Sequence, residues 1–269
     1  MPRKPTLSPS KISTFLACPH KFYWTYLNEM GRYFLRSKSY FSFGTSLHRV
    51  LQRFHDSGDS GVQTASQAAA ALEEGWIDAG YQTPEQMMEA QGEGKVILES
   101  YIENFNALNP EATPLLIEKM LRYDMGDFVL RGKLDRLDEH PDGLLEIVDY
   151  KSGRTEVTAD EIEDDLAMSV YQLLVKRNYP NRPVTATIIA LRTLAKASAS
   201  LDDARLAEFE QDILKIGQTI LEFESREAGT KEPSTIPQSK SLCASCDFLS
   251  LCQKRGLTLP EPAAAPPES

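Results

Sequence analysis

The sequence predicts an α/β fold in which helices flank a central mixed sheet. Residues 115–123 and 184–191 are predicted as strands, and the second is rich in β-branched residues. Residues 128–137 and 144–150 are predicted as a hairpin, because the turn formers Pro141, Asp142 and Gly143 stand between them. With 269 residues and 41% hydrophobic content, the chain can bury the core of one main domain.

Helical spacing of apolar residues predicts the elements around the strands. A helix begins near Ser8, and residues 63–108 form a helical insertion whose second helix begins at Pro84. Residues 160–165 are an acidic lead-in to a helix over 166–178, where negative charge favours a helix N-terminus. A long amphipathic helix follows over 206–223. The proline-rich residues 257–269 predict a disordered tail.

The predicted hairpin contains charged residues that are unusual in a β-strand. Asp149 and Lys151 share a strand face, and pairing about a turn near 140–141 brings Asp135 roughly opposite Ile147 on that face. Aspartate is depleted in strands and is costly beside a buried apolar run unless a cation offsets it. Two carboxylates beside a lysine suit a divalent metal and the water it activates. The alternative is a solvated strand end whose aspartates pair with Lys133, Arg136 or Lys151.

A second candidate ligand lies on a predicted helix near residue 48. His48 falls at the margin of an apolar stripe, from which it can reach inward. The stripe consists of Phe43, Leu47, Val50, Leu51 and Phe54. From the helix alone, His48 is either a metal ligand or a core histidine with satisfied hydrogen bonds.

The charge distribution indicates where an anionic partner would bind. The net charge is −10, yet residues 1–55 hold nine Lys or Arg against one acid, Glu29. The remainder holds 20 basic and 38 acidic residues, so phosphate attraction falls to the first segment. No apolar run approaches a membrane span and the start lacks the apolar core of a signal peptide, so we expect a cytoplasmic protein that contacts no membrane.

Aromatic and basic residues alternate within this basic segment. They could form a stacking platform for single-stranded nucleic acid. The alternative is that most of the aromatics are core and the cations form a solvated face. The set is Lys21, Arg32, Arg36 and Lys38 with Tyr23, Trp24, Tyr33 and Tyr40.

The four cysteines predict a metal site rather than disulfides. Cys243, Cys246 and Cys252 form a C-x2-C-x5-C string, and Cys18 lies near the other end of the chain. Disulfides are rare in cytoplasmic proteins, whereas four thiolates form a complete ligand set for zinc or for a four-iron four-sulfur cluster. Zinc ribbons supply two close pairs, and this chain supplies one cysteine plus three.

The hairpin and the histidine helix carry a family resemblance. The strings Gly-Lys-Leu-Asp135, Ile-Val-Asp149-Tyr-Lys151-Ser-Gly and Gly44-Thr-Ser-Leu-His48-Arg-Val-Leu resemble the PD-(D/E)xK nuclease superfamily, and within it the RecB-like exonucleases. The resemblance implies a restriction-endonuclease-like fold. It also implies Mg2+ or Mn2+ bound by His48, Asp135, Asp149 and the Tyr150 carbonyl, with Lys151 positioning or activating the attacking water.

Glu118 and Tyr171 match the pattern of that family only in part. Related nucleases often carry a glutamate on the first strand, where Glu118 stands, although the strand pattern favours an exposed side chain. Tyr171 matches a substrate-contacting tyrosine of the family. The glutamine expected four residues before it is replaced by Ala167, and Gln172 follows the tyrosine instead.

The cysteine arrangement resembles the iron–sulfur staple of AddB-type nucleases and of the small RecB-like nucleases associated with CRISPR adaptation. It implies a four-iron four-sulfur cluster held by Cys18, Cys243, Cys246 and Cys252. This cluster would join segments 8–30 and 240–256 within one nuclease domain, 1–256.

The resemblance implies a metal-dependent DNA exonuclease that acts on single strands, in DNA repair, recombination or CRISPR adaptation. The sequence contains no Gly-x4-Gly-Lys-Ser/Thr phosphate loop, so ATP dependence would require a helicase partner. One alternative is a non-catalytic iron–sulfur DNA-binding scaffold. Another is a zinc-stabilised interaction module, in which the hairpin acids are ordinary surface charges.

Overall fold

The computed structural model describes residues 4–56, 61–108, 111–238 and 240–257. The chain packs as two compact units, one of Met1–Pro9 with Ser37–Lys215 and the other of Ser10–Arg36 with Ile216–Ser269. The first unit contains the sheet, and the second contains all four cysteines. Within the described ranges, no helix has the length and apolar character needed to cross a membrane.

A six-stranded mixed sheet forms the centre of the first unit. Its order is β1-β3-β4-β5-β6, and β2 also pairs with β3. The β1/β3 and β4/β5 pairs are parallel and the other pairs are antiparallel. The predicted mixed sheet is therefore confirmed, and the short edge strands β1 and β6 are additional. The strands are β1 (Thr6–Leu7), β2 (Thr113–Asp124), β3 (Val129–Glu139), β4 (Leu145–Lys151), β5 (Val184–Ala190) and β6 (Ala195–Ala199).

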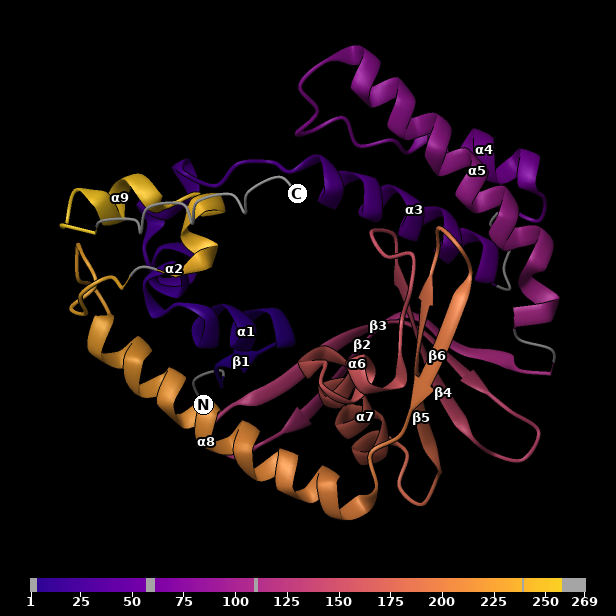
Figure 1. Ribbon diagram of the computed structural model, residues 1–269. Helices are drawn as coiled ribbons and strands as arrows, with labels where there is room; N and C mark the ends of the chain where they lie inside the picture. The colour runs from indigo at the N-terminus through magenta and orange to yellow at the C-terminus, as the bar shows by residue number, and fades with distance from the viewer. Residues whose placement is uncertain (1–3, 57–60, 109–110, 239, 258–269) are drawn as a thin grey trace, which may run out of the picture. The chain divides into compact units, whose positions relative to one another are not determined.

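Helices cover both faces of this sheet (Figure 1). On one face α3 (Ser39–His55), α4 (Ala65–Glu74) and α5 (Pro84–Leu108) pack against Val148 and Tyr150 of β4. On the other face α7 (Leu166–Asn178) places Met168 against Ile188 of β5. Because both faces are covered, every residue of β4 except the last is buried.

Two helices begin where the sequence predicted, at residues that favour a helix N-terminus. Pro84 is the first residue of α5. The carboxylate of Asp165 accepts hydrogen bonds from the amides of Ala167 at 2.7 Å and Met168 at 3.1 Å, which caps α7. The acidic lead-in before it contains a short helix of its own, α6 (Ala159–Glu163).

The hairpin pairs two residues away from the predicted register. Leu137 lies opposite Ile147 and Arg136 opposite Val148, so the prediction that Asp135 faces Ile147 is wrong. The loop is longer than predicted: five residues, 140–144, separate β3 from β4, and the His140 amide donates to the Leu144 carbonyl across them. A shift of two residues keeps every side chain on its face, so the α7 side of the sheet still carries Asp135 and Asp149.

The second unit is built from short helical segments and the end of a long helix. The segments are α1 (Pro9–Ala17), α2 (Pro19–Phe22), α9 (Leu249–Gln253) and the C-terminal part of α8 (Asp203–Glu227). Phe22 packs edge-on against Phe15 at 5.3 Å and Phe223 at 6.0 Å between ring centroids. The apolar stripe of α8 therefore serves core packing here, as predicted.

The predicted aromatic platform divides into two groups. Tyr23 and Trp24 are core residues, 1% and 7% exposed, so neither can stack a base. Tyr33 and Tyr40 are 67% and 63% exposed. The first residue of the predicted tail, Leu257, is buried beside Cys243 and Cys252, and residues 258–269 of that tail lie outside the described residues.

Candidate metal centre

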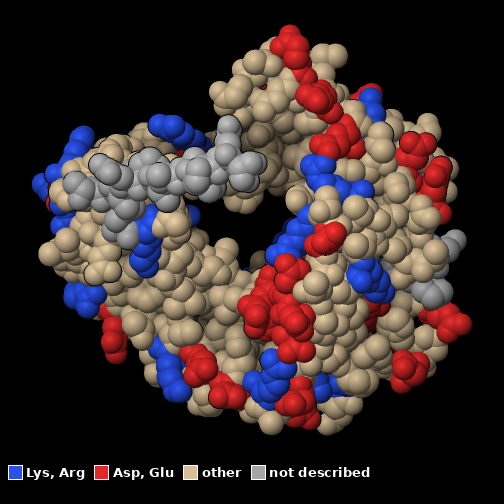
Figure 2. Space-filling view, viewed as in Figure 1, with Lys and Arg blue, Asp and Glu red and all other residues tan. Residues whose placement is uncertain are grey.

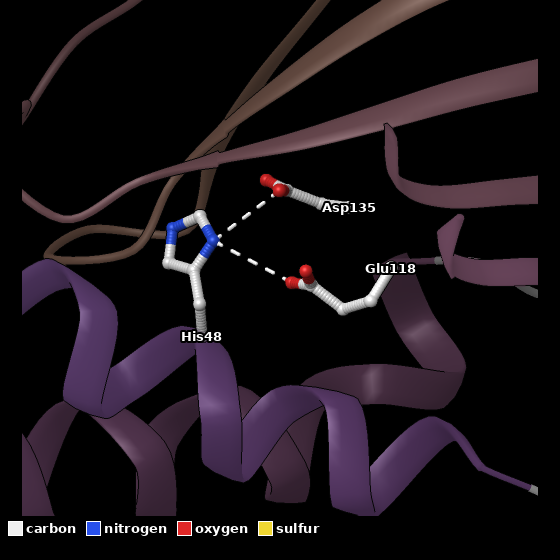
Figure 3. A group of neighbouring side chains, drawn as sticks. All are labelled: His48, Glu118 and Asp135. Carbon is white, nitrogen blue, oxygen red and sulfur yellow. Dashed lines mark ion pairs between the residues drawn. The ribbon is translucent and has the colours of Figure 1, made fainter. Parts of the chain in front are cut away.

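His48 stands on α3 and points toward two carboxylates on the sheet (Figure 3). Its Nδ1 lies 3.3 Å from Oδ1 of Asp135 and 4.0 Å from Oε1 of Glu118. Its Nε2 donates to the carbonyl of Tyr150 at 3.1 Å. The prediction that His48 and the Tyr150 carbonyl approach the hairpin acids agrees with this arrangement, and the carbonyl fixes the orientation of the ring.

Glu118 is brought to the site by an irregular backbone. Its φ of +50° lies in the left-handed region, which is uncommon for residues other than glycine and is concentrated at functional sites. Ile117 pairs with Arg136 and Lys119 with Leu134, so Glu118 stands across from Asp135. Its side chain is only 11% exposed and pairs with Lys133. The prediction of an exposed strand glutamate is therefore wrong.

The donor set of these three residues suits a divalent cation. The ligand atoms of His48, Glu118 and Asp135 all lie within 4.8 Å of one another, and no other such group of His, Cys, Asp and Glu occurs among the described residues. Two carboxylates that face each other across a strand pair repel unless a cation offsets them. Carboxylates with one imidazole suit Mn2+ or Mg2+.

The pKa of His48 is raised by the negative charge of the carboxylates around it. Burial lowers this pKa, but the hydrogen bond and charge of Asp135, with the charges of Asp149 and Glu118, raise it to about 9. Without a metal, the imidazolium therefore acts as the counter-ion of these carboxylates. A bound divalent cation would take over that role.

Asp149 and Lys151 complete the site from β4. Asp149 is 7% exposed, and its Oδ2 lies 2.7 Å from Nζ of Lys151. Burial and then the charge of Asp135 raise the pKa of Asp149 to about 6, although Lys151 opposes the shift. The structure therefore brings together Asp135, Asp149, Lys151 and His48, as the sequence predicted. The alternative interpretation also expected an ion pair between Lys151 and a hairpin aspartate. This pair is present, but Asp149 is buried rather than solvated.

Tyr171 of α7 is affected by the charges of the same carboxylates. Burial and then the charges of Asp149 and Asp135 raise the pKa of its hydroxyl. Gly132 leaves room for the Tyr171 ring, because a Cβ there would lie 2.8 Å from it. Gln172 is buried elsewhere, where its Oε1 accepts from the Leu201 amide at 2.9 Å. Gln172 thus has a structural role, whereas Tyr171 is the residue of this pair whose pKa the carboxylates of the site raise.

A buried polar network lies beneath the site, on the α3 side of the sheet. Arg136 is fully buried, and its Nε donates to Asp138 at 3.0 Å. Its Nη1 donates to the Tyr101 hydroxyl at 2.8 Å and to His55 Nε2 at 2.9 Å, and also bonds the Tyr150 hydroxyl. The sequence interpretation of Arg136 as a solvated partner for hairpin aspartates is wrong.

The cysteines of the second unit affect the pKa of one another's thiols. Burial and then the negative charges of Cys18, Cys246 and Cys243 raise the pKa of Cys252 to about 11. Two of the sulfurs accept amide hydrogen bonds, Cys18 from Lys21 at 3.5 Å and Cys243 from Lys240 at 3.3 Å. No three of the thiols lie within 4.8 Å of one another in the described chain.

Comparisons with known proteins found similar solved structures. The solved structure of SSO0001 is 13% identical, with 96% of this chain and 90% of that chain covered and a TM-score of 0.38. The solved structure of a protein proposed to be an exonuclease, from Eubacterium rectale, is 15% identical, with 86% and 96% covered and a TM-score of 0.40. No curated protein matches the chain.

The family comparison covers nearly the whole chain. The model of the PD-(D/E)XK nuclease superfamily matches residues 6–253, which include the sheet, the candidate ligands and the four cysteines. The chain therefore belongs to the PD-(D/E)XK nuclease superfamily.

Proposed function

We propose that the protein is a divalent-metal-dependent exonuclease that hydrolyses phosphodiester bonds in single-stranded DNA. The observation that carries this proposal is the convergence of His48, Glu118 and Asp135 from a helix and two strands, with their ligand atoms within 4.8 Å. Asp149 and Lys151 stand beside them on β4. Superfamily members use divalent metals, and this ligand set fits one.

The ligands proposed for the metal are His48, Asp135, Asp149 and the Tyr150 carbonyl, and the geometry adds Glu118 to them. When bound, a divalent cation supplies a Lewis acid for the scissile phosphate and lowers the pKa of a water. The side chains of the protein position the ligands and the attacking water. Asp135 is held in place by the Tyr150 amide, which donates to its Oδ2 at 3.0 Å.

Lys151 orients the attacking water in this proposal. Burial lowers the pKa of its amine, but the charge and hydrogen bond of Asp149 outweigh burial and raise it, so the ammonium form is favoured. An ammonium group can donate to a water oxygen and stabilise negative charge that develops on the phosphate. Tyr171, with its pKa raised, remains a neutral hydroxyl that can donate to a phosphate oxygen.

The second unit would hold a four-iron four-sulfur cluster on Cys18, Cys243, Cys246 and Cys252. Amide hydrogen bonds to two of the sulfurs support this, because such bonds tune iron–sulfur clusters. One zinc ion with Zn–S bonds of about 2.3 Å needs its sulfurs roughly 4 Å apart. A cubane cluster binds each thiolate through a separate iron, so it does not require three sulfurs within 4.8 Å of one another.

The test is cleavage of end-labelled single- and double-stranded DNA by anaerobically purified protein, with Mg2+, Mn2+ or EDTA. We expect stepwise shortening of linear single strands from one end, dependent on the metal. A circular single strand distinguishes the two modes of cleavage, because an exonuclease leaves it intact. Binding without cleavage in every metal would contradict the proposal and favour a DNA-binding scaffold.

A further inference from the structure

A large cavity extends from the candidate metal centre along α3. Its volume is about 1280 Å³, and its lining includes His48, Asp135 and Lys151 at one end and Ser39, Tyr40 and Phe41 of the first helical turn. Pockets for small ligands hold about 300–1,000 Å³. The cavity therefore has room for a polymeric substrate that reaches beyond the metal site.

Two aromatic side chains are exposed within this cavity. Tyr40 and Phe41 are 63% and 66% exposed, although both are large and partly or wholly apolar. Their ring centroids lie 4.4 Å apart with planes tilted by 44°, so the rings form one continuous apolar surface. The apolar stripe of α3 is distinct from this surface, because Phe43, Leu47 and Leu51 pack into the core, although Phe43 also lines the cavity. The two rings therefore serve no packing role in the core.

One helical face connects these rings to the metal centre. Phe41, Thr45, His48 and Gln52 recur at spacings of three, four and seven residues, which places them on one side of α3, and all line the cavity. His48 follows Phe41 by seven residues, which is about 10 Å along the helix axis. Stacked nucleotides rise about 3.4 Å each, so this distance corresponds to roughly three nucleotides.

Arg49 supplies an available cation on the same helix. It is exposed and lines the cavity, and it has no hydrogen-bond or ion-pair partner within the part of the chain that the structure describes. The other cations that line the cavity are already paired, Lys133 with Glu118, Lys151 with Asp149, Arg154 with Glu161 and Arg192 with Glu93. A guanidinium group suits the bidentate recognition of a phosphate.

Acidic surfaces around the cavity restrict the path of an anionic strand. Figure 2 shows acidic side chains along α5 and around α6. Glu89 and Glu93 of α5 also line the cavity, whereas Arg49 lines it from α3. A polyanion would therefore keep its phosphates on the α3 side, where Arg49 and the two rings lie.

We propose that Tyr40 and Phe41 form a base-stacking subsite for single-stranded DNA, with Arg49 binding a phosphate between this subsite and the metal centre. This inference rests on the proposed function and adds how the strand is held. The rings contact a base two or three nucleotides from the scissile phosphate. Stacking on them accepts any base but requires an unpaired one, because the faces of duplex bases are already covered.

The test uses single-stranded oligonucleotides with 2-aminopurine at one of the first four positions from either end. Full-length protein is titrated in metal-free buffer, where binding is measured without cleavage. We expect fluorescence quenching at the second or third position from one end. The Tyr40→Ala/Phe41→Ala variant should lose this quenching and bind at least about fivefold more weakly. Tyr40→Trp should retain both.

Two matched variants separate stacking from other effects. Tyr33→Ala removes an equally exposed tyrosine, 67% exposed, that does not line the cavity, and it should bind like wild type. Arg49→Gln should weaken binding and reduce its salt dependence without changing the quenching pattern. Unchanged thermal midpoints would show that all variants are folded.

The outcomes distinguish this inference from the proposed function. If wild type cleaves single strands and the double alanine variant binds with unchanged affinity and quenching, the stacking subsite is wrong and the proposed function stands. If wild type cleaves neither single nor double strands in any metal, the proposed function fails. Even if wild type does not cleave, quenching of 2-aminopurine that is present in wild type and lost in Tyr40→Ala/Phe41→Ala would still support the stacking subsite.

Discussion

The amide of Tyr150 donates a hydrogen bond to Oδ2 of Asp135 at 3.0 Å, beyond the last paired residues of the hairpin, Arg136 and Val148. The carbonyl of Tyr150 accepts from Nε2 of His48 at 3.1 Å. The backbone of one residue thus holds a carboxylate and an imidazole in fixed relation. Since both contacts are made by main-chain atoms, the side chain of Tyr150 is left to join the buried network of Arg136.

Metal binding should release a proton from His48. In the metal-free protein its pKa is raised to about 9, so the imidazole is protonated at neutral pH, whereas a ligand must be neutral. The apparent affinity for Mn2+ should therefore rise by up to about tenfold per pH unit between pH 7 and 9. Calorimetry in two buffers of different ionisation enthalpy measures the protons released.

His48→Ala should weaken Mn2+ binding and abolish that proton release, and a higher metal concentration should partly restore cleavage. His140→Ala is the matched control, because His140 pairs with Glu146 away from the site. Equal affinity and equal proton release in wild type and His48→Ala would show that His48 is not a ligand.

Arg136→Met should destabilise the fold, because it leaves the buried Asp138 without its partner. Breaking a buried ion pair from one side costs about 3–5 kcal/mol. Arg136→Met/Asp138→Leu removes both charges and should recover most of the lost thermal midpoint. Arg182→Met, which breaks the half-buried pair with Glu139, should change the midpoint little. A double variant no more stable than Arg136→Met would argue against a buried ion pair.

Acid should destabilise the protein through His55. Burial and then the charge of Arg136 lower its pKa to about 2, whereas an unfolded histidine titrates near 6.5. The unfolded state therefore takes up a proton below about pH 6.5 that the folded state does not, and stability falls by about 1.4 kcal/mol per pH unit from this group.

His55→Gln should flatten that dependence, because an amide oxygen can accept from Arg136 without titrating. The measurement is the thermal midpoint at pH 7.5, 6.5 and 5.5, compared with wild type and with His140→Gln. A slope identical in wild type and His55→Gln would exclude His55 as its source.

If the proposed cluster is bound, Cys18→Ser should remove it and loosen both ends of the chain. Closing a loop of a hundred residues or more stabilises a fold by roughly 4–5 kcal/mol in the chain-entropy description. Wild type isolated anaerobically should contain iron and acid-labile sulfide near four each per chain, with brown colour. The variant should lack them and unfold at lower temperature, while Ser245→Ala, within the same string, should retain them. Stoichiometric zinc without sulfide in wild type would replace the cluster with a zinc site.

The sequence predicted the parts of the fold that periodicity and turn chemistry determine locally. Pro84 begins α5 and Asp165 caps α7, as their residue types indicate. Asp149 and Lys151 share a face because the strand period is fixed, and a register error of two residues did not change that face. The hairpin site was therefore predictable although the pairing was not.

The features that the sequence did not predict depend on contacts between residues far apart in the chain. Glu118 joins the site through a left-handed backbone conformation that no residue type at that position signals. Arg136 is buried only because α3 and α5 bring His55 and Tyr101 over it. Tyr23 and Trp24 were indistinguishable from Tyr33 by sequence, and only their burial separates them.

Single-turnover cleavage of an end-labelled single strand tests the central claim most directly. Asp135→Asn and Lys151→Ala should each slow cleavage by on the order of a hundredfold or more in Mg2+ and Mn2+, with unchanged thermal midpoints. Asp78→Asn, an exposed aspartate outside the site, should cleave like wild type. Cleavage at the wild-type rate by both site variants in both metals would contradict the active site described.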